Sequence, residues 1–86
     1  MKEYYVYVLE SELDQSWYIG YTNDFIRRVE EHNSGKSYYT KRRMPWKLIY
    51  LEMSFNKYDA ISREKYLKTG MGRRYLKNRL KNQINF

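Results

Sequence analysis

Two strand-like runs separated by a short polar gap constrain the fold of this chain more than any other feature. Residues 4–9 (Tyr-Tyr-Val-Tyr-Val-Leu) and 17–21 (Trp-Tyr-Ile-Gly-Tyr) are rich in aromatic and β-branched side chains, which favour strands. The stretch between them, residues 10–16, is too short for the crossover of about a dozen residues that parallel strands require. The two runs are therefore predicted to pair as an antiparallel hairpin.

A helix, a loop and a third strand are predicted to follow the hairpin. The helix is expected over residues 25–33, after the candidate N-caps at 22–24. Residues 36–45 lack periodicity and are expected to form an exposed loop, whereas residues 46–53 alternate as a strand. The apolar residues expected on the buried face of the helix are Phe25, Ile26 and Val29.

The C-terminal third of the chain is predicted to be helical. A helix beginning at residue 54 or 56 is expected to run to Thr69 and to stop at Gly70. Met71-Gly72 is expected to be a hinge before a last helix over about residues 73–82, which Leu76 and Leu80 would anchor. The element order ββαβαα predicts an α/β (α+β) fold in which helices flank a three-stranded antiparallel sheet.

Length and composition exclude several classes of protein. The 86 residues have room for one domain, with a core over about residues 4–69 and a basic C-terminal helix over about 71–83. The absence of cysteine excludes disulfides, thiolate nucleophiles and Cys-ligated zinc, and one histidine argues against a His-based zinc site. No apolar run approaches the roughly 18 residues that cross a bilayer, and the N-terminus does not resemble a signal peptide. We therefore expect a cytoplasmic protein.

Positive charge is concentrated in two acid-free blocks, although residues 1–64 as a whole are neutral. The 17 Lys and Arg against 10 Asp and Glu give a net charge of +7. Residues 65–86 contain bases but no acid, and residues 36–47 interleave bases with tyrosine and tryptophan. Each block could be a solvated face. Bases neutralise phosphates and aromatic rings stack on unpaired bases, so a nucleic-acid partner is favoured over a membrane surface. The candidate contacts are Lys36, Lys41, Arg42, Arg43, Lys47, Lys68, Arg73, Arg74 and Lys77.

Tyrosines and a glycine in the hairpin are the first candidates for chemistry. Alternation places Tyr18 and Gly20 on one face of the second strand. Glycine within a strand commonly marks the close approach of another backbone or a ligand. A hairpin centred between Glu12 and Leu13 would place Tyr7 opposite Tyr18, so two phenols would lie beside the glycine. On the hairpin alone, simple packing of an aromatic pair is the better interpretation.

Three polar residues on the predicted helices are further candidates. Arg28 and His32 are four residues apart and therefore share one helix face, where a solvated arginine and an ordinary surface histidine are the default explanation. Glu64 is the last acid in the chain, and an i,i+4 pair with Lys68 would account for it without any function.

In this order, the landmarks resemble the GIY-YIG endonuclease superfamily, whose signature is Gly-Ile-Tyr, a spacer, Tyr-Ile-Gly, a helical arginine and a later glutamate. The resemblance covers about residues 4–68. Within the superfamily, the sequence is similar to small stand-alone members, to the N-terminal nuclease domain found in excision repair nucleases and to homing endonucleases. The residues that carry it are Tyr5-Val6-Tyr7, Tyr18-Ile19-Gly20, Arg28, His32 and Glu64.

The resemblance implies a DNA endonuclease, in a role such as DNA repair, that hydrolyses phosphodiester bonds with a single Mg²⁺ or Mn²⁺ ion. Glu64 would be the metal ligand. A single carboxylate is sufficient for this role, because Mg²⁺ often binds proteins through one or two carboxylates. Arg28 would hold the scissile phosphate and Tyr18 would act as general base. Tyr7 would position the water or relay its proton, with His32 in support.

Some features depart from the family pattern or leave alternatives open. Tyr5 stands where the first glycine of the signature would be, and Asn78 cannot be aligned with the supporting Asn or Gln of the family. Gly20 would let the backbone approach the substrate. No attached DNA-binding domain is expected, so specificity must come from the domain, from a flapped, branched or single-stranded substrate, or from a protein partner. DNA is favoured over RNA, and a monomer and a homodimer are both open. The alternatives are a non-catalytic nucleic-acid-binding module and a structural protein whose tyrosines are core.

Overall fold

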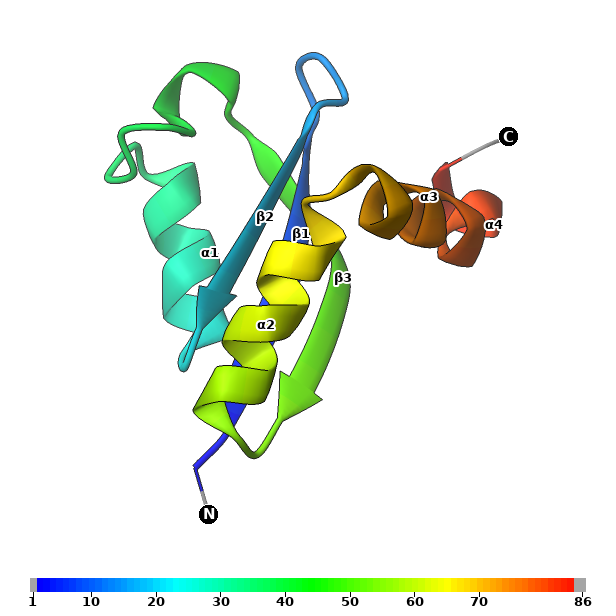
Figure 1. Ribbon diagram of the computed structural model, residues 1–86. Coiled ribbons are helices and arrows are strands. Elements are labelled where there is room, and N and C mark those ends of the chain that lie inside the picture. Colours follow the sequence, from blue (N-terminus) through cyan, green and yellow to red (C-terminus); the bar gives the residue numbers. More distant parts are fainter. Residues whose placement is uncertain (1, 85–86) are drawn as a thin grey trace.

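The computed structural model describes residues 2–84, which form a three-stranded antiparallel sheet with helices on both faces (Figure 1). The strand order is β2-β1-β3, so β1 is central and β2 has one free edge. The predicted fold class and the order ββαβαα are confirmed, with a short 3₁₀ turn and a final short helix in addition. The elements are β1 (Tyr4–Ser11), β2 (Trp17–Thr22), α1 (Phe25–Asn33), the 3₁₀ turn Lys41–Arg43, β3 (Trp46–Ser54), α2 (Lys57–Leu67), α3 (Gly70–Arg79) and α4 (Lys81–Ile84).

The central strand divides the core into two clusters, because successive side chains point to opposite faces of the sheet. Val6 and Val8 pack with apolar residues of α2 and α3, whereas Tyr7 and Leu9 pack with Trp46 on the face that α1 covers. Burial on both faces explains why residues 4–9 lack polar alternation. None of the helices within residues 2–84 is long and apolar enough to span a membrane.

Helix α1 has the predicted bounds but not the predicted buried face. Ile26 is 64% exposed, and the buried residue of α1 is His32, with Phe25 and Val29 only half-buried. The sheet beneath α1 presents the hydroxyl of Tyr7, which requires a polar partner when it is buried. The helix therefore turns its histidine, rather than its isoleucine, toward the sheet, and the surface-histidine interpretation is wrong.

The junction between α2 and α3 also differs from the prediction. Gly70 does not end α2 but is the first residue of α3, because the Thr69 hydroxyl accepts the Gly72 N–H and caps the new helix. Gly72 is not a hinge: a Cβ there would overlap the backbone of α2 at Tyr66, so the glycine permits the two helices to touch. Leu76 and Leu80 anchor α3 as predicted, since both are buried.

The segment between α1 and β3 is only partly the exposed loop that its composition suggests. Ser37 and Thr40 are buried within it, and the Thr40 carbonyl accepts a hydrogen bond from the Trp46 indole N–H at 2.8 Å. Asn33 fastens the end of α1 to the start of β3, because its amide accepts from the Trp46 backbone N–H at 2.6 Å and donates to the Trp46 carbonyl at 2.9 Å. The loop is therefore held against the α1 face of the sheet.

Candidate active site

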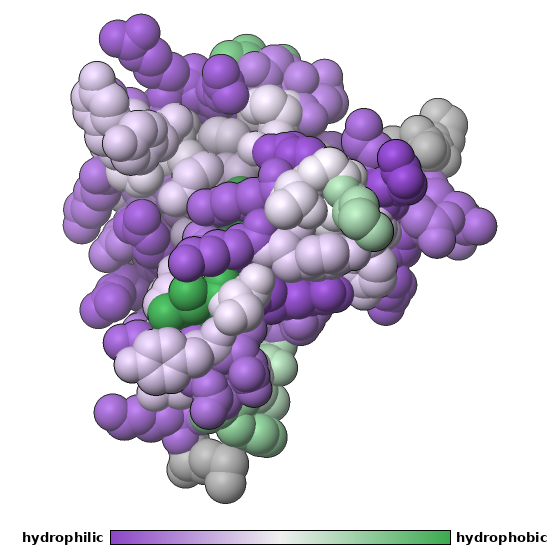
Figure 2. Space-filling view, viewed as in Figure 1, coloured by the Kyte–Doolittle hydropathy of each residue, from purple (hydrophilic) through white to green (hydrophobic). Residues whose placement is uncertain are grey.

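Polar candidates from four elements gather around Tyr7, whose pKa is influenced by Tyr18, Arg28 and Glu64. Tyr7 comes from β1, Tyr18 from β2, Arg28 from α1 and Glu64 from α2. Helices α1 and α2 lie on opposite faces of the sheet, and β2 runs between them (Figure 1). The face seen in Figure 2 is predominantly hydrophilic, with hydrophobic patches that are small and separate.

A buried hydrogen-bonded chain forms the interior of the site. The Tyr7 hydroxyl and His32 Nε2 are hydrogen-bonded at 3.0 Å, and His32 Nδ1 and the Thr40 hydroxyl are hydrogen-bonded at 2.7 Å. All three side chains are at most 1% exposed. The chain links the central strand, α1 and the loop after α1, so it fixes the position of each ring relative to the others.

The histidine and the phenol of this chain are both neutral near pH 7. Burial, with a contribution from the nearby Arg28 charge, lowers the pKa of His32 to about 4. Burial and the neighbouring Tyr18 raise the pKa of Tyr7 to about 12, against the opposing effect of Arg28. A neutral imidazole between two hydroxyls has one donor and one acceptor nitrogen, so both hydrogen bonds of His32 can form in either tautomer.

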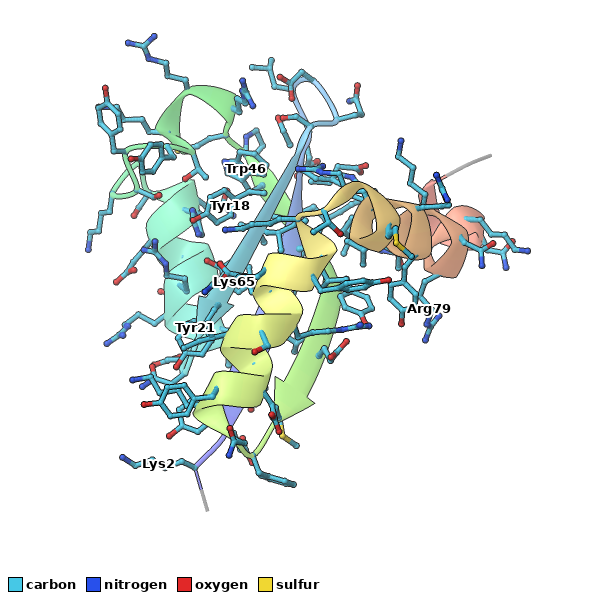
Figure 3. All side chains as sticks on the ribbon, in the orientation of Figure 1. Lys2, Tyr18, Tyr21, Trp46, Lys65 and Arg79 are labelled. Carbon is cyan, nitrogen blue, oxygen red and sulfur yellow. The ribbon has the colours of Figure 1, made fainter. Side chains whose placement is uncertain are left out.

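Tyr18 is the half-exposed member of the aromatic group, and its ring centroid lies 4.8 Å from that of His32 and 6.2 Å from that of Tyr7. Figure 3 shows Tyr18 beside Trp46, whose ring centroid is 6.5 Å away. Tyr7 is buried beneath this group. Tyr18 is therefore the tyrosine of the pair that an incoming molecule can reach.

The predicted hairpin register is wrong, and the error changes the interpretation of Gly20. Tyr7 pairs with Gly20 rather than with Tyr18, which lies opposite Leu9. A side chain at Gly20 would overlap the Tyr7 ring, including its hydroxyl. The missing Cβ therefore makes room for Tyr7, so the space through which we expected the backbone at Gly20 to approach a substrate is filled by Tyr7.

Arg28 lies on the α1 face that borders the tyrosines, one turn before His32. Its guanidinium Nη1 donates to Glu31 Oε1 at 2.9 Å, and its side chain is 33% exposed. Glu31 raises the pKa of Arg28, and the charge of Arg28 lowers the pKa of Tyr7. A guanidinium that borders the site and remains partly open can accept an anion from solvent.

Glu64 comes from α2, on the opposite face of the sheet, and its charge influences Tyr7. Its side chain is 19% exposed and its Oε2 lies 3.0 Å from Lys68 Nζ, so the expected i,i+4 pair exists. Its charge contributes to the raised pKa of Tyr7. Within residues 2–84, no three His, Cys, Asp or Glu side chains form a group that could hold a metal ion.

The candidate phosphate contacts fall into separate groups. Lys36, Lys41 and Arg42 lie on exposed surface after α1, beside Tyr38 and Tyr39, which are 74% and 82% exposed. Arg43 lies 3.7 Å from Asp14 of the hairpin loop. The contacts from the C-terminal part are split by face: Arg73 and Lys77 border the hairpin, whereas Arg74 and Asn78 line a different groove with Met71 and Tyr75.

Sequence reasoning missed two residues that build the site. Thr40 orients His32, and Asn33 holds Trp46. Thr40 lies in the segment 36–45, which was predicted to be an exposed loop, so nothing in its local sequence indicated its burial. Asn33 gave no signal, because its partner is thirteen residues away.

Comparisons with known proteins identify the family to which the chain belongs. The sequence-family model of the GIY-YIG catalytic domain matches residues 3–82 of the chain. A UPF0213 protein of Streptococcus pneumoniae is 52% identical over 74% of this chain, and the chain spans 65% of that relative, slightly under two thirds. UPF0213 protein YsiG of Lactococcus lactis is 39% identical over 98% of this chain and 81% of its own length. The solution NMR structure of UPF0213 protein BH0048 from Bacillus halodurans is 38% identical, covers 86% of this chain and 81% of its own, and has a TM-score of 0.54. The chain belongs to the GIY-YIG family.

Proposed function

We propose that this protein is a metal-dependent endonuclease that hydrolyses phosphodiester bonds in DNA, with single-stranded or structured DNA as its substrate. The observation that carries the proposal is the gathering of Tyr18, Arg28 and Glu64 around Tyr7, with His32 buried behind them. The GIY-YIG match over nearly the whole chain supports it, since that domain belongs to a nuclease superfamily.

Glu64 would hold the divalent ion, Mg²⁺ or Mn²⁺. A single carboxylate fits such an ion, because Mg²⁺ commonly keeps several waters and takes its remaining oxygens from substrate phosphate. The Glu64 side chain is 19% exposed, so a hydrated ion can reach its carboxylate once Lys68 moves away from Oε2. When bound, the ion supplies Lewis-acid stabilisation of the charge that develops on the phosphate.

Arg28 would bind the scissile phosphate through its planar guanidinium, which matches two phosphate oxygens at once. Its present partner, Glu31, is partly exposed, so phosphate can compete for the guanidinium. In hydrolysis, water adds to phosphorus while the bond from phosphorus to one sugar oxygen breaks. Water must lose a proton in this step, and the departing oxygen must gain one.

Tyr18 would orient the attacking water, because its ring is the one that borders solvent. Its oxygen would take the proton of the water as its own hydroxyl proton passes to solvent. Tyr7 and His32 would act as positioning residues: in the tautomer protonated at Nδ1, His32 donates to Thr40 and accepts from Tyr7. A neutral His32 and a neutral Tyr7 keep the interior of the site uncharged, so the positive charges that face the phosphate are Arg28 and the bound ion.

The loop after α1 supports an unpaired nucleic-acid substrate. Tyr38 and Tyr39 are exposed rings whose centroids lie 5.5 Å apart, and Lys41 Nζ lies 5.0 Å from the centroid of Tyr38. Exposed aromatic rings among bases provide stacking surfaces for unpaired nucleotides. Thr40 ties this loop directly to His32, so a strand held here would lie beside the site.

The second candidate function is a nucleic-acid-binding module without catalysis. The ion pairs Arg28–Glu31 and Glu64–Lys68 favour it, because they satisfy both charged groups without a phosphate or a metal. Such a module would use the same basic blocks to hold nucleic acid, or to recruit an enzyme to it.

The test is cleavage of labelled single-stranded, duplex and branched DNA with Mg²⁺ or Mn²⁺ at low salt, with Glu64→Ala beside the wild type. Glu64→Ala is expected to abolish cleavage and leave DNA binding nearly intact. Glu30→Ala is the matched control, since Glu30 is an exposed glutamate of α1. Metal-dependent cleavage by Glu64→Ala would refute the role of Glu64, and tight binding without cleavage by the wild type would favour the binding module.

A further inference from the structure

An open groove of about 510 Å³ separates the tip of the β1–β2 hairpin from α3. The hairpin contributes Glu10, Gln15, Ser16 and Trp17, and α3 contributes bases from its adjacent face, Arg73 and Lys77. The volume lies within the range of small-molecule sites. The groove contains none of the five residues assigned to catalysis.

The charges in this groove are arranged to receive an anion. Arg73 and Lys77 are one helical turn apart, and neither forms an ion pair with another residue among those whose side chains the structure describes. The one acid in the lining, Glu10, accepts a hydrogen bond from the Trp17 indole N–H at 3.1 Å. Two unpaired cations therefore face one engaged carboxylate, and the net charge of the lining is positive.

The groove and the active site share one strand edge. Trp17 and Tyr18 are neighbours on β2, and their side chains point to opposite faces of the sheet: Trp17 packs against the α2 and α3 cluster, and Tyr18 against the α1 cluster. A strand of nucleic acid that crosses the β2 edge at Tyr18 therefore reaches Trp17 on the other side. If the proposed function holds, the groove is the next surface along the path of the strand from Tyr18.

We propose that this groove is a nucleotide-binding subsite that holds the part of a nucleic-acid strand that has passed the active site. The inference deepens the proposed function and rests on it. The Trp17 ring stacks on a base, and Arg73 and Lys77 bind the flanking phosphates. The second carboxylate oxygen of Glu10 accepts from a base amino group, a contact that carboxylates make with cytosine.

The proposal divides the C-terminal bases into two classes. Arg73 and Lys77 contact the strand, and Arg74 and Arg79 do not. Arg74 lines the separate groove with Met71 and Tyr75, and Figure 3 shows Arg79 on the side of α3 away from the hairpin tip. Charge alone does not make this distinction, because all four bases lie on one helix.

The first experiment compares Arg73→Ala/Lys77→Ala with Arg79→Ala/Lys81→Ala, a control that also removes one arginine and one lysine, at exposed positions outside the groove. Binding to a labelled single-stranded oligodeoxynucleotide is measured by fluorescence anisotropy without divalent metal, across a salt series. The groove variant should bind at least about tenfold more weakly, and its slope of log K against log salt should fall by about 1.4, which is about 0.7 for each of two phosphates. Equal losses in the two variants would overturn the subsite.

The second experiment uses the fluorescence of Trp17. The chain has two tryptophans, and Trp46 is only 4% exposed. Saturating oligodeoxynucleotide should quench the wild type, and Trp17→Phe should lose that quenching. Quenching that persists in Trp17→Phe would overturn the stacking contact.

Cleavage assays on the same variants separate the subsite from the proposed function. Wild-type cleavage with equal binding by both double variants contradicts the subsite alone. A selective binding loss in the groove variant, without cleavage by any protein, contradicts the nuclease alone.

Discussion

Replacement of Gly20 by alanine should destabilise the protein and displace Tyr7 from His32. Tyr7 lies opposite Gly20 in the β1–β2 pairing, and a methyl group there would come within 2.9 Å of Tyr7 Cε1 and closer still to the ring atoms beyond it. The ring has little freedom to move, because Tyr7 is 1% exposed and its hydroxyl is held by His32 at 3.0 Å.

The expected cost follows from two effects. Overpacking of a buried site costs about 1–3 kcal/mol, and an unsatisfied buried polar group costs about 1–3 kcal/mol. Part of the strain is relieved when the hydrogen bond to His32 breaks, so the two costs do not add fully. We therefore expect the free energy of unfolding to fall by about 2–4 kcal/mol.

Urea unfolding of a double-mutant cycle with Tyr7→Leu tests this explanation. Leucine lacks the three atoms nearest to the added methyl, which are the Tyr7 hydroxyl oxygen, Cζ and Cε1, so Gly20→Ala should cost much less in the Tyr7→Leu background. Gly70→Ala is the control, because a Cβ there would meet nothing within 4 Å. An equal cost of Gly20→Ala in the two backgrounds would refute the packing explanation and favour a substrate role for Gly20.

Two further predictions concern the aromatic group. Because the folded protein holds the pKa of His32 at about 4 against an ordinary value of 6.5, the unfolded chain binds the extra proton between these values. The contribution of His32 to the free energy of unfolding should therefore be fully present above pH 6.5 and be lost as the pH falls toward 4. His32→Gln should remove roughly 3 kcal/mol of this pH dependence. Denaturant titrations that give His32→Gln the same pH profile as the wild type would refute the prediction. Tyr18→Phe keeps the ring contacts, so its melting temperature should stay near that of the wild type while cleavage falls by a factor of about 10² or more. A large fall in the melting temperature of Tyr18→Phe, together with the loss of cleavage, would instead show that Tyr18 is a core residue.

Local patterns were sufficient to predict most of the secondary structure. The hairpin, the bounds of α1 and the third strand follow from residue type and alternation, and Asp24 and Asn56 are N-caps through their own side chains. The five polar landmarks lie in a fixed order along the chain, so they could be identified before their positions in space were known. Each of these features depends on residues that are close in sequence.

Tertiary structure decided the features that depend on contacts between distant segments. The pairing of Tyr7 with Gly20, the burial of His32 and the contact of Gly72 with α2 each required the position of a second element. Charge patterning likewise located the basic C-terminal helix but not which of its faces borders the hairpin.

The physical reason is the same in each case. The sequence by itself determined the elements, their order and the chemistry of the candidate residues, because propensity and capping act within a few residues. Only the packing of α1 against β1 decided that a helical histidine would meet a strand tyrosine, and with it that Tyr7 is buried while Tyr18 borders solvent. Burial and hydrogen bonding across the chain then set the protonation states on which the proposed chemistry depends.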